Sequence, residues 1–303
     1  MKGLVIKNTG SGYQVRTNEG EVFDCKIKGN FRIKGIKSTN PIAVGDWVEF
    51  NEAGLIHHIQ DRTNYVVRKP ANLSKQLHVI AANVDQVLLV VTLKNPETPL
   101  AFIDRFITST EAYRIPTIIA VNKVDLLDEY DQEYLQAFIN LYTSIGYPCV
   151  PTSFTQQNGT EQLANLLQGK TTLLSGNSGV GKSTLINHLV PNAQARVSDI
   201  SSSHHKGMHT TTFSEMYDIN PETHLIDTPG IKGFGLIDMD QWEVSHYFKE
   251  IFHYGAHCRF DNCTHRSEPG CAVREAVDNH FIAQSRYQSY LSILEDINAG
   301  KYR

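Results

Sequence analysis

The chain has 303 residues, of which 41% are apolar and 20% charged. This length suits two or three domains, and the composition excludes a disordered or collagen-like chain. The longest apolar runs are much shorter than the ~18 residues that a membrane-spanning helix needs, and the N-terminus lacks a signal-peptide pattern. The sequence therefore predicts a soluble, cytoplasmic protein with no membrane partner, and we expect a monomer.

The net charge of −4 conceals a basic first segment. Residues 1–70 carry 11 Lys and Arg against 7 Asp and Glu. Between Lys26 and Lys37, cations surround Phe31, and this mixture of charges and an aromatic ring is typical of proteins that bind single-stranded nucleic acid. The pattern favours a phosphate-rich partner such as RNA, although an ordinary basic surface loop has the same composition.

The first 65 residues read as a small β-barrel. Short runs rich in Val, Ile, Phe and Tyr alternate with Gly, Asn and Ser turns, which is the pattern of an OB-fold. We expect strands at Leu4–Lys7, Tyr13–Thr17, Val22–Ile27, Trp47–Phe50 and Leu55–Ile59.

Residues 66–230 alternate strands with helices, which predicts a parallel sheet covered on both faces. The expected strands are Val87–Thr92, Thr117–Val121, Pro148–Thr152, Lys170–Ser175 and His224–Ile226. A helix begins with Thr98 as its N-cap and Pro99 at its first position, and a second helix passes through Leu135 and Tyr142 and ends at Gly146. A third helix covers Lys182–Leu189. The stretch 191–211 has little apolar periodicity, as in functional or disordered loops.

A glycine-rich segment follows the strand that ends at Ser175. It fits the GxxxxGK[ST] pattern, in which glycines let several backbone N–H groups face one anion at a helix N-terminus. Lys182 would neutralise the β- and γ-phosphates, and the Ser183 hydroxyl would bind Mg²⁺. A purely structural glycine turn is the alternative. The predicted nucleotide-binding residues here are Gly176, Asn177, Ser178, Gly179, Val180, Gly181, Lys182, Ser183 and Thr184.

The sequence NKVD, residues 122–125, directly follows another predicted strand. In open α/β sheets ligands bind at the carboxyl ends of strands. A carboxylate at Asp125 accepts two N–H donors from guanine, one of which adenine lacks, while Asn122, Lys123 and Val124 support the base pocket. NKxD alone is a weak signal, but together with the phosphate loop it predicts GTP and GDP as ligands.

The sequence DTPG, residues 227–230, matches DxxG after the strand His224–Ile226. Asp227 would hold Mg²⁺ through water, and the Gly230 N–H would contact the γ-phosphate. A hydroxyl from the threonine triplet 210–212 would complete the Mg²⁺ shell, with Thr211 and Thr212 as the leading pair. Strand propensity is the alternative explanation of that triplet.

The region 231–303 is mostly helical by composition and contains a dense Cys/His cluster. Three thiols and one imidazole within 14 residues suit a tetrahedral structural Zn²⁺. The alternative is a set of buried free cysteines with a chance histidine. The predicted ligands are Cys258, Cys263, His265 and Cys271, and His257 is a possible competitor of His265.

The order of the motifs is unusual, because NKxD precedes the phosphate loop and DxxG comes last. In this order the chain resembles the circularly permuted GTPases of the ribosome small-subunit-dependent family over essentially its whole length. The resemblance implies domains at 1–65 (OB-fold barrel), 66–230 (permuted GTPase) and 231–303 (zinc-binding), and it prefers His265 to His257. It also implies a cytoplasmic factor that acts late in maturation of the small ribosomal subunit, binds its rRNA and hydrolyses GTP when that subunit stimulates it.

The residue that orients the attacking water in many GTPases is replaced in this chain. Many GTPases have a water-orienting Gln directly after DxxG, but this chain has Ile231, so intrinsic turnover should be slow. His209 is a candidate catalytic group within the chain. Asn177 resembles the Asn with which some related GTPases bind K⁺ near the phosphates. The other readings are a nucleotide-gated RNA-binding scaffold and a P-loop ATPase or kinase, against which Asn122 and Asp125 argue.

Overall fold

The computed structural model describes residues 1–27, 41–68, 78–156, 158–190, 193, 214–228 and 239–299. These residues belong to two compact units. The first unit comprises Met1–Glu97, Ile115–Leu127 and Cys149–Gly233. The second comprises Thr98–Arg114, Asp128–Pro148 and Phe234–Arg303, so it combines the C-terminal region with two segments from the middle of the chain.

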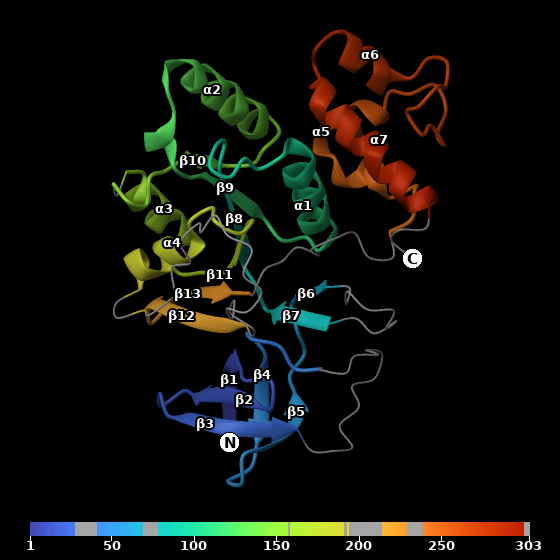
Figure 1. The fold of residues 1–303 in the computed structure, drawn as a ribbon. Helices are drawn as coiled ribbons and strands as arrows, with labels where there is room; N and C mark the ends of the chain where they lie inside the picture. The colour runs from blue at the N-terminus through green and yellow to red at the C-terminus, as the bar shows by residue number, and fades with distance from the viewer. Residues whose placement is uncertain are drawn as a thin grey trace. The chain divides into compact units, whose positions relative to one another are not determined.

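The first unit begins with the barrel (Figure 1), whose five predicted strands are confirmed. They pair in the order β1-β2-β3-β5-β4, and an additional β1–β4 pairing closes the ring. Alternate residues point inward, so that Val5, Val15 and Phe50 belong to one fully or almost fully buried apolar core. The strands are β1 (Lys2–Asn8), β2 (Tyr13–Thr17), β3 (Val22–Ile27), β4 (Trp47–Phe50) and β5 (Leu55–Ile59).

A β-hairpin that the sequence analysis did not predict follows the barrel. Its strands, β6 (Tyr65–Arg68) and β7 (His78–Ala82), pair antiparallel and form a separate two-stranded sheet. A parallel bridge between Val44 and Ala81 links this hairpin to the segment that precedes β4.

The nucleotide-binding pattern lies on a sheet of six strands. Five are parallel, as predicted, in the order β10-β9-β8-β11-β13. The sixth, β12, is antiparallel to β13, because only Pro221 and Glu222 separate the two strands and so short a turn returns the chain beside itself. The strands are β8 (Gln86–Val91), β9 (Thr117–Val121), β10 (Cys149–Pro151), β11 (Thr171–Ser175), β12 (Glu215–Asn220) and β13 (Thr223–Asp227).

The strand order changes direction between β8 and β11. The chain runs outward from β8 to β9 and β10, and then returns to β11 and continues on the other side to β13. The crevice at such a switch point, at the carboxyl ends of the strands, is where open α/β sheets bind ligands. Helices α3 (Thr160–Leu167) and α4 (Lys182–Leu189) share an apolar core with β8, β9, β11 and β13.

The barrel and this sheet are hydrogen-bonded to each other, which gives a continuous sheet of 11 strands. The junction is the antiparallel pairing of β1 with β12, in which Lys7 lies opposite Glu215. The backbone N–H of Asn8 also donates to the carbonyl of Ser214, at 3.0 Å.

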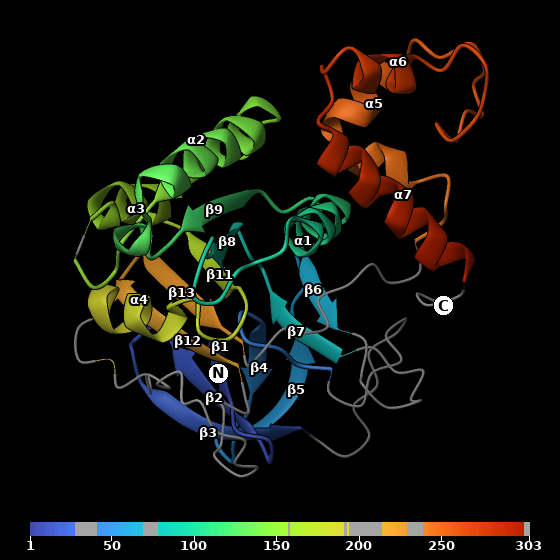
Figure 2. The same cartoon turned by 45° about the horizontal axis from the view of Figure 1, so that its top comes forward.

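The second unit is helical, as predicted for the C-terminal region; its helices α5, α6 and α7 are drawn in orange and red in Figure 2. The helix expected at Thr98 begins one residue later than predicted. Pro99 occupies the N-cap position, and no side chain caps this end. The helices are α1 (Leu100–Ala112), α2 (Glu129–Ser144), α5 (Lys249–Gly255), α6 (Ala272–Asp278) and α7 (Gln284–Asn298).

A buried charge network connects α1 with α5 and α7. The guanidinium of Arg286 donates to Glu250 at 2.6 Å and to Asp104 at 2.9 Å, and Tyr142 and Ser289 donate their hydroxyls to Asp104. The Arg286 and Asp104 side chains are at most 1% exposed. Because a buried charge is tolerated only when it is paired and hydrogen-bonded, these contacts define how α1, α5 and α7 pack.

In the parts of the chain that the structure describes, none of the helices is both long and apolar enough to cross a bilayer.

Candidate functional site

The phosphate loop joins β11 to α4. Gly176 has φ +143°, and a Cβ on it would lie 2.3 Å from the carbonyl oxygen of Val90. Gly181 has φ +106°, and a Cβ there would lie 2.4 Å from Nδ2 of Asn122. Only glycine fits at these two positions, so the loop can curl tightly against β8 and the NKVD segment. The helix α4 then begins at Lys182, and among the described residues no side chain caps this end, which suits a helix start that binds an anion.

Lys182 lies back across this loop. Its Nζ donates to the carbonyl oxygens of Gly176 at 2.7 Å and Asn177 at 2.8 Å. Burial lowers the pKa of Lys182, and the negative charge of Asp227 opposes that shift. The ammonium group is therefore held inside the loop. When a nucleotide binds, its phosphate oxygens would replace the two carbonyl oxygens as acceptors of the Lys182 hydrogen bonds. Ser183 and Thr184, in the first turn of α4, are half-buried.

Asp227 ends β13 with one carboxylate oxygen unused. Its Oδ1 is buried and accepts no hydrogen bond from any residue that the structure describes. Burial raises the pKa of this carboxyl to about 6, Lys182 opposes the rise, and Glu215 adds a smaller contribution to it. The hydroxyls of Ser175 and Thr228 are also buried and have no hydrogen-bond partner among the described residues. Orphaned buried oxygens beside a lysine fit a hydrated Mg²⁺ and phosphates, which would satisfy them.

The NKVD segment lies beside the phosphate loop. Asn122 is buried, and its Nδ2 donates to the carbonyl of Val180 at 2.8 Å. Its Oδ1 accepts the backbone N–H of Phe154 at 3.1 Å. One amide therefore holds together three segments that are far apart in the chain. Sequence reasoning did not single out Phe154, which the backbone bond to Asn122 places in this site.

The two residues that would read the base differ in their environment. Lys123 has φ +64° and donates its Nζ to the carbonyl of Asn95, while burial lowers its pKa. Asp125 lies in the short 3-10 helix Val124–Leu126 with an exposed side chain. The N–H of Val124 donates to the carbonyl of Thr152 at 3.2 Å, which fixes the start of this turn.

The remaining switch residues lie outside the described part of the chain. These are His209, Thr210, Thr211, Thr212, Gly230 and Ile231. The basic loop is outside it as well, apart from Lys26 at its start. The structure thus brings the phosphate loop, NKVD and Asp227 together, while the roles predicted for the threonines, Gly230 and His209 stay predictions.

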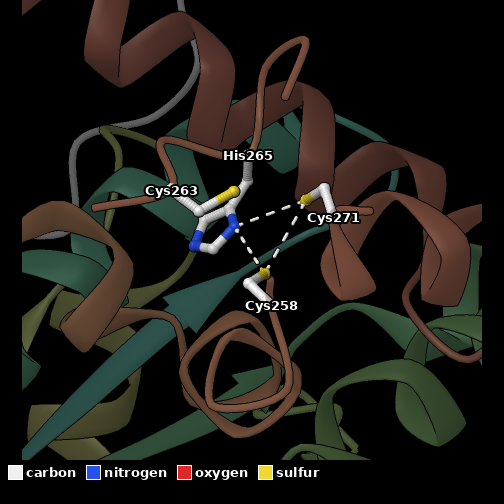
Figure 3. A group of neighbouring side chains, drawn as sticks. All are labelled: Cys258, Cys263, His265 and Cys271. Carbon is white, nitrogen blue, oxygen red and sulfur yellow. Dashed lines mark hydrogen bonds between the residues drawn. The ribbon is translucent and has the colours of Figure 1, made fainter. Parts of the chain in front are cut away.

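The Cys/His cluster is assembled in the second unit (Figure 3). Nδ1 of His265 lies 3.5 Å from the Sγ atoms of Cys258 and Cys271, which are themselves 3.9 Å apart. The four ligand atoms, including Sγ of Cys263, all lie within 4.8 Å of one another. A tetrahedron with Zn–S of about 2.3 Å and Zn–N of about 2.0–2.1 Å separates S from N by about 3.5 Å and S from S by about 3.8 Å. The donor set and its spacing therefore fit zinc.

The surroundings of the cluster fix its ligands. Tyr287 donates its hydroxyl to the carbonyl of His265 at 2.6 Å, and Tyr290 donates to that of Thr264 at 3.0 Å. Burial would raise the pKa of Glu268, but its carboxylate accepts the Thr264 hydroxyl and backbone N–H groups of the ligand loop, and these bonds lower the pKa to about 2. His257 is exposed and outside the group of four, as the preference for His265 predicts.

The sheet order, the phosphate loop after β11, the NKVD motif after β9 and DxxG at the end of β13 define a circularly permuted P-loop GTPase. The family model described as RsgA GTPase matches residues 59–237, and that of the RsgA N-terminal domain matches residues 2–54. The chain belongs to the RsgA GTPase family.

Full-length relatives and solved structures agree with this assignment. "Small ribosomal subunit biogenesis GTPase RsgA" of Phocaeicola vulgatus is 59% identical over 100% of this chain and 99% of its own. The protein of the same name from Bacteroides fragilis is 58% identical over the same shares. The crystal structure of YjeQ from Thermotoga maritima has a TM-score of 0.77 at 34% identity and covers 97% of both chains. YloQ, "a circularly permuted GTPase", has a TM-score of 0.70 at 28% identity and covers 100% of this chain and 96% of its own.

Proposed function

We propose that this chain hydrolyses GTP to GDP and phosphate as a maturation factor of the small ribosomal subunit. The observation that carries the proposal is the hydrogen bond from Asn122 to Val180, which sets the guanine-reading segment against the phosphate loop despite their reversed order. The names of the full-length relatives support the ribosomal role. Action at a late stage, stimulation by the subunit and rRNA binding are further parts of this proposal.

The nucleotide would lie along the carboxyl ends of the strands. Asp125 accepts the guanine N–H groups, and Lys123 lines the base pocket. The N–H groups of the loop from Gly176 to Ser183 cradle the α- and β-phosphates, while Lys182 neutralises the β- and γ-phosphates. Thr184, which follows Ser183 in the first turn of α4, also belongs to this phosphate-binding segment.

The phosphate end would also hold a magnesium ion. The residues that would hold it are Ser183 through its hydroxyl, Asp227 through water, and Thr211 or Thr212. When bound, Mg²⁺ supplies positive charge to the β- and γ-phosphates. We further propose that Asn177 takes part in a K⁺ site. Equal rates of GTP hydrolysis in NaCl and in KCl would contradict this proposal.

Hydrolysis needs an oriented water. Gly230 contacts the γ-phosphate, and Ile231 offers no hydrogen bond to water, so the free protein turns over slowly. His209 is the proposed group within the chain that acts on this water, and the ribosomal partner orders it.

The chain would consist of three domains with separate roles. Residues 1–65 form the OB-like barrel, residues 66–230 the permuted GTPase, and residues 231–303 a module with one structural Zn²⁺ on Cys258, Cys263, His265 and Cys271. We propose a cytoplasmic monomer in which the barrel and the zinc module contact rRNA.

GTP turnover measured with and without purified small ribosomal subunits tests the proposal. We expect slow hydrolysis alone and strong stimulation by the subunits, with Lys182→Ala slower by about a hundredfold. Lys170→Ala is the matched control, because Lys170 precedes the opposite end of β11 and contacts Gln86. If small subunits did not increase the turnover rate, a nucleotide-gated scaffold would be favoured. Hydrolysis of ATP in preference to GTP would contradict the guanine site.

A further inference from the structure

Three charged residues lie in one row across the junction of the barrel and the nucleotide-binding sheet. Lys7 of β1 is opposite Glu215 of β12, and Glu215 is opposite Asp227 of β13. Residues directly opposite each other in antiparallel strands project from the same face. The row therefore starts in the barrel and ends at the aspartate proposed to hold magnesium.

The middle carboxylate is held at both oxygens. Lys7 donates its Nζ to Oε1 of Glu215 at 2.7 Å, and Tyr217 donates its hydroxyl to Oε2 at 3.2 Å. Opposed residues of an antiparallel pair have Cβ atoms about 4.5–5.5 Å apart, so the charge of Glu215 is felt at Asp227. Lys7 is the cation that compensates this charge.

The same junction anchors the start of β12. Asn8 donates its backbone N–H to the carbonyl of Ser214, directly before Glu215. The barrel thus holds the beginning of the strand whose partner, β13, ends at Asp227. A shift of β1 relative to β12 would change the distance from Lys7 to Glu215, and with it the electrostatic field at Asp227.

We propose that Lys7 of the barrel is a positioning residue for the magnesium and phosphate end of the nucleotide site, acting through Glu215. The inference rests on the proposed GTP site and adds to it a route by which the barrel affects nucleotide binding. Because coupling between two sites is reciprocal, a partner that moves the barrel changes Mg²⁺ affinity, and bound Mg²⁺ changes how firmly the barrel docks.

The other face of β12 provides a matched control. Arg16 of β2 pairs with Asp218, which also contacts Nδ1 of His224 at 2.6 Å. Asp218 is three residues from Glu215, so its side chain leaves the opposite face of the strand. Arg16→Met therefore removes an ion pair between the barrel and β12 without changing the row that ends at Asp227.

The test is the Mg²⁺ affinity of the GDP complex, measured by Mg²⁺ titration with a fluorescent GDP analogue. Lys7→Met leaves Glu215 uncompensated, so Mg²⁺ should bind about threefold to tenfold more tightly, and Glu215→Gln should weaken binding by a similar factor. The double variant should return to within about twofold of the unmodified chain, and Lys7→Arg should match it. Arg16→Met should leave the affinity unchanged.

Unchanged Mg²⁺ affinity in both Lys7→Met and Glu215→Gln, with native circular dichroism, would overturn the inference. So would an equal change in Lys7→Met and Arg16→Met, because that would reflect barrel docking in general. If the unmodified chain bound the GDP analogue without any dependence on Mg²⁺, the proposed nucleotide site would fail, and this inference with it.

Discussion

The side-chain amide of Asn122 donates a hydrogen bond of 2.8 Å to the backbone carbonyl of Val180, which lies 58 residues further along the chain. The same side chain accepts the N–H of Phe154. This buried residue therefore joins the NKVD segment to the phosphate loop and to the segment that follows β10.

Asn122→Ala should weaken GDP binding. The substitution leaves the Val180 carbonyl and the Phe154 N–H without a buried partner, at a cost of about 1–3 kcal/mol, which corresponds to about a tenfold to hundredfold loss of affinity. Fluorescent GDP titration measures it. The control is Asn140→Ala, on the exposed face of α2, where the side chain accepts a hydrogen bond of 2.8 Å from Gln136. Equal affinities for both variants would contradict the linking role of Asn122.

The acid side of the pH profile should report on Asp227. Burial raises the pKa of its carboxyl to about 6, so without Mg²⁺ this group is mostly ionised at pH 7 and mostly protonated at pH 5. A protonated Asp227 lacks the negative charge that would hold hydrated Mg²⁺, so the Mg²⁺ affinity of the GDP complex should fall about tenfold from pH 7 to pH 5. Asp227→Asn should retain only the titration of the nucleotide itself. A pH dependence that is identical in the two proteins would exclude Asp227 from the metal site.

Zinc should be required for the C-terminal module to keep its structure. Burial raises the pKa of Cys263 to about 12, so without metal its thiol is protonated at pH 7, and zinc binding should release protons and strengthen as the pH rises. Cys258→Ser should lose most of the bound zinc and lower the melting temperature. Metal analysis and thermal unfolding measure both effects, with Cys149→Ser on β10 as the control. Full zinc content in Cys258→Ser would argue against the proposed ligand set.

Arg286 should contribute strongly to the stability of the second unit. Arg286→Met leaves Asp104 and Glu250 buried without their cation, which costs about 3–5 kcal/mol of unfolding free energy. Arg274→Met, at an exposed position of α6, should change little. Urea denaturation compares the two, and a similar midpoint for both would show that the network contributes no net stability.

The motif-bearing elements were the most predictable part of the fold. The barrel strands are short runs rich in Val, Ile, Phe and Tyr between turn residues, and α4 begins at Lys182 as predicted because its start is fixed by Gly181. The antiparallel β12 was not predicted, since its sequence EMYDIN mixes acidic residues with apolar ones and lacks a buried run. Its ion pairs with Lys7 and Arg16 of the barrel explain those charges, and they appear only in three dimensions.

The candidate site was predictable in its members but not in its connections. The motifs identify Asn122, Lys182 and Asp227, yet no local pattern shows that Asn122 contacts Val180 or that Glu215 lies opposite Asp227. Likewise, the cysteine spacing predicts the zinc ligands, whereas the support from Tyr287 depends on the packing of α7.

These permuted segments should form one guanine nucleotide site. The most direct test is whether the Asp125→Asn variant prefers guanosine or xanthosine diphosphate. An aspartate accepts two N–H donors from guanine, whereas an asparagine offers one donor and one acceptor, which match xanthine. Titration with guanosine and xanthosine diphosphates should show that guanosine diphosphate binds about a hundredfold or more weakly and that xanthosine diphosphate now binds. Lys182→Ala should lose the binding of either nucleotide. An Asp125→Asn variant that still prefers guanosine diphosphate as the unmodified chain does would contradict the account.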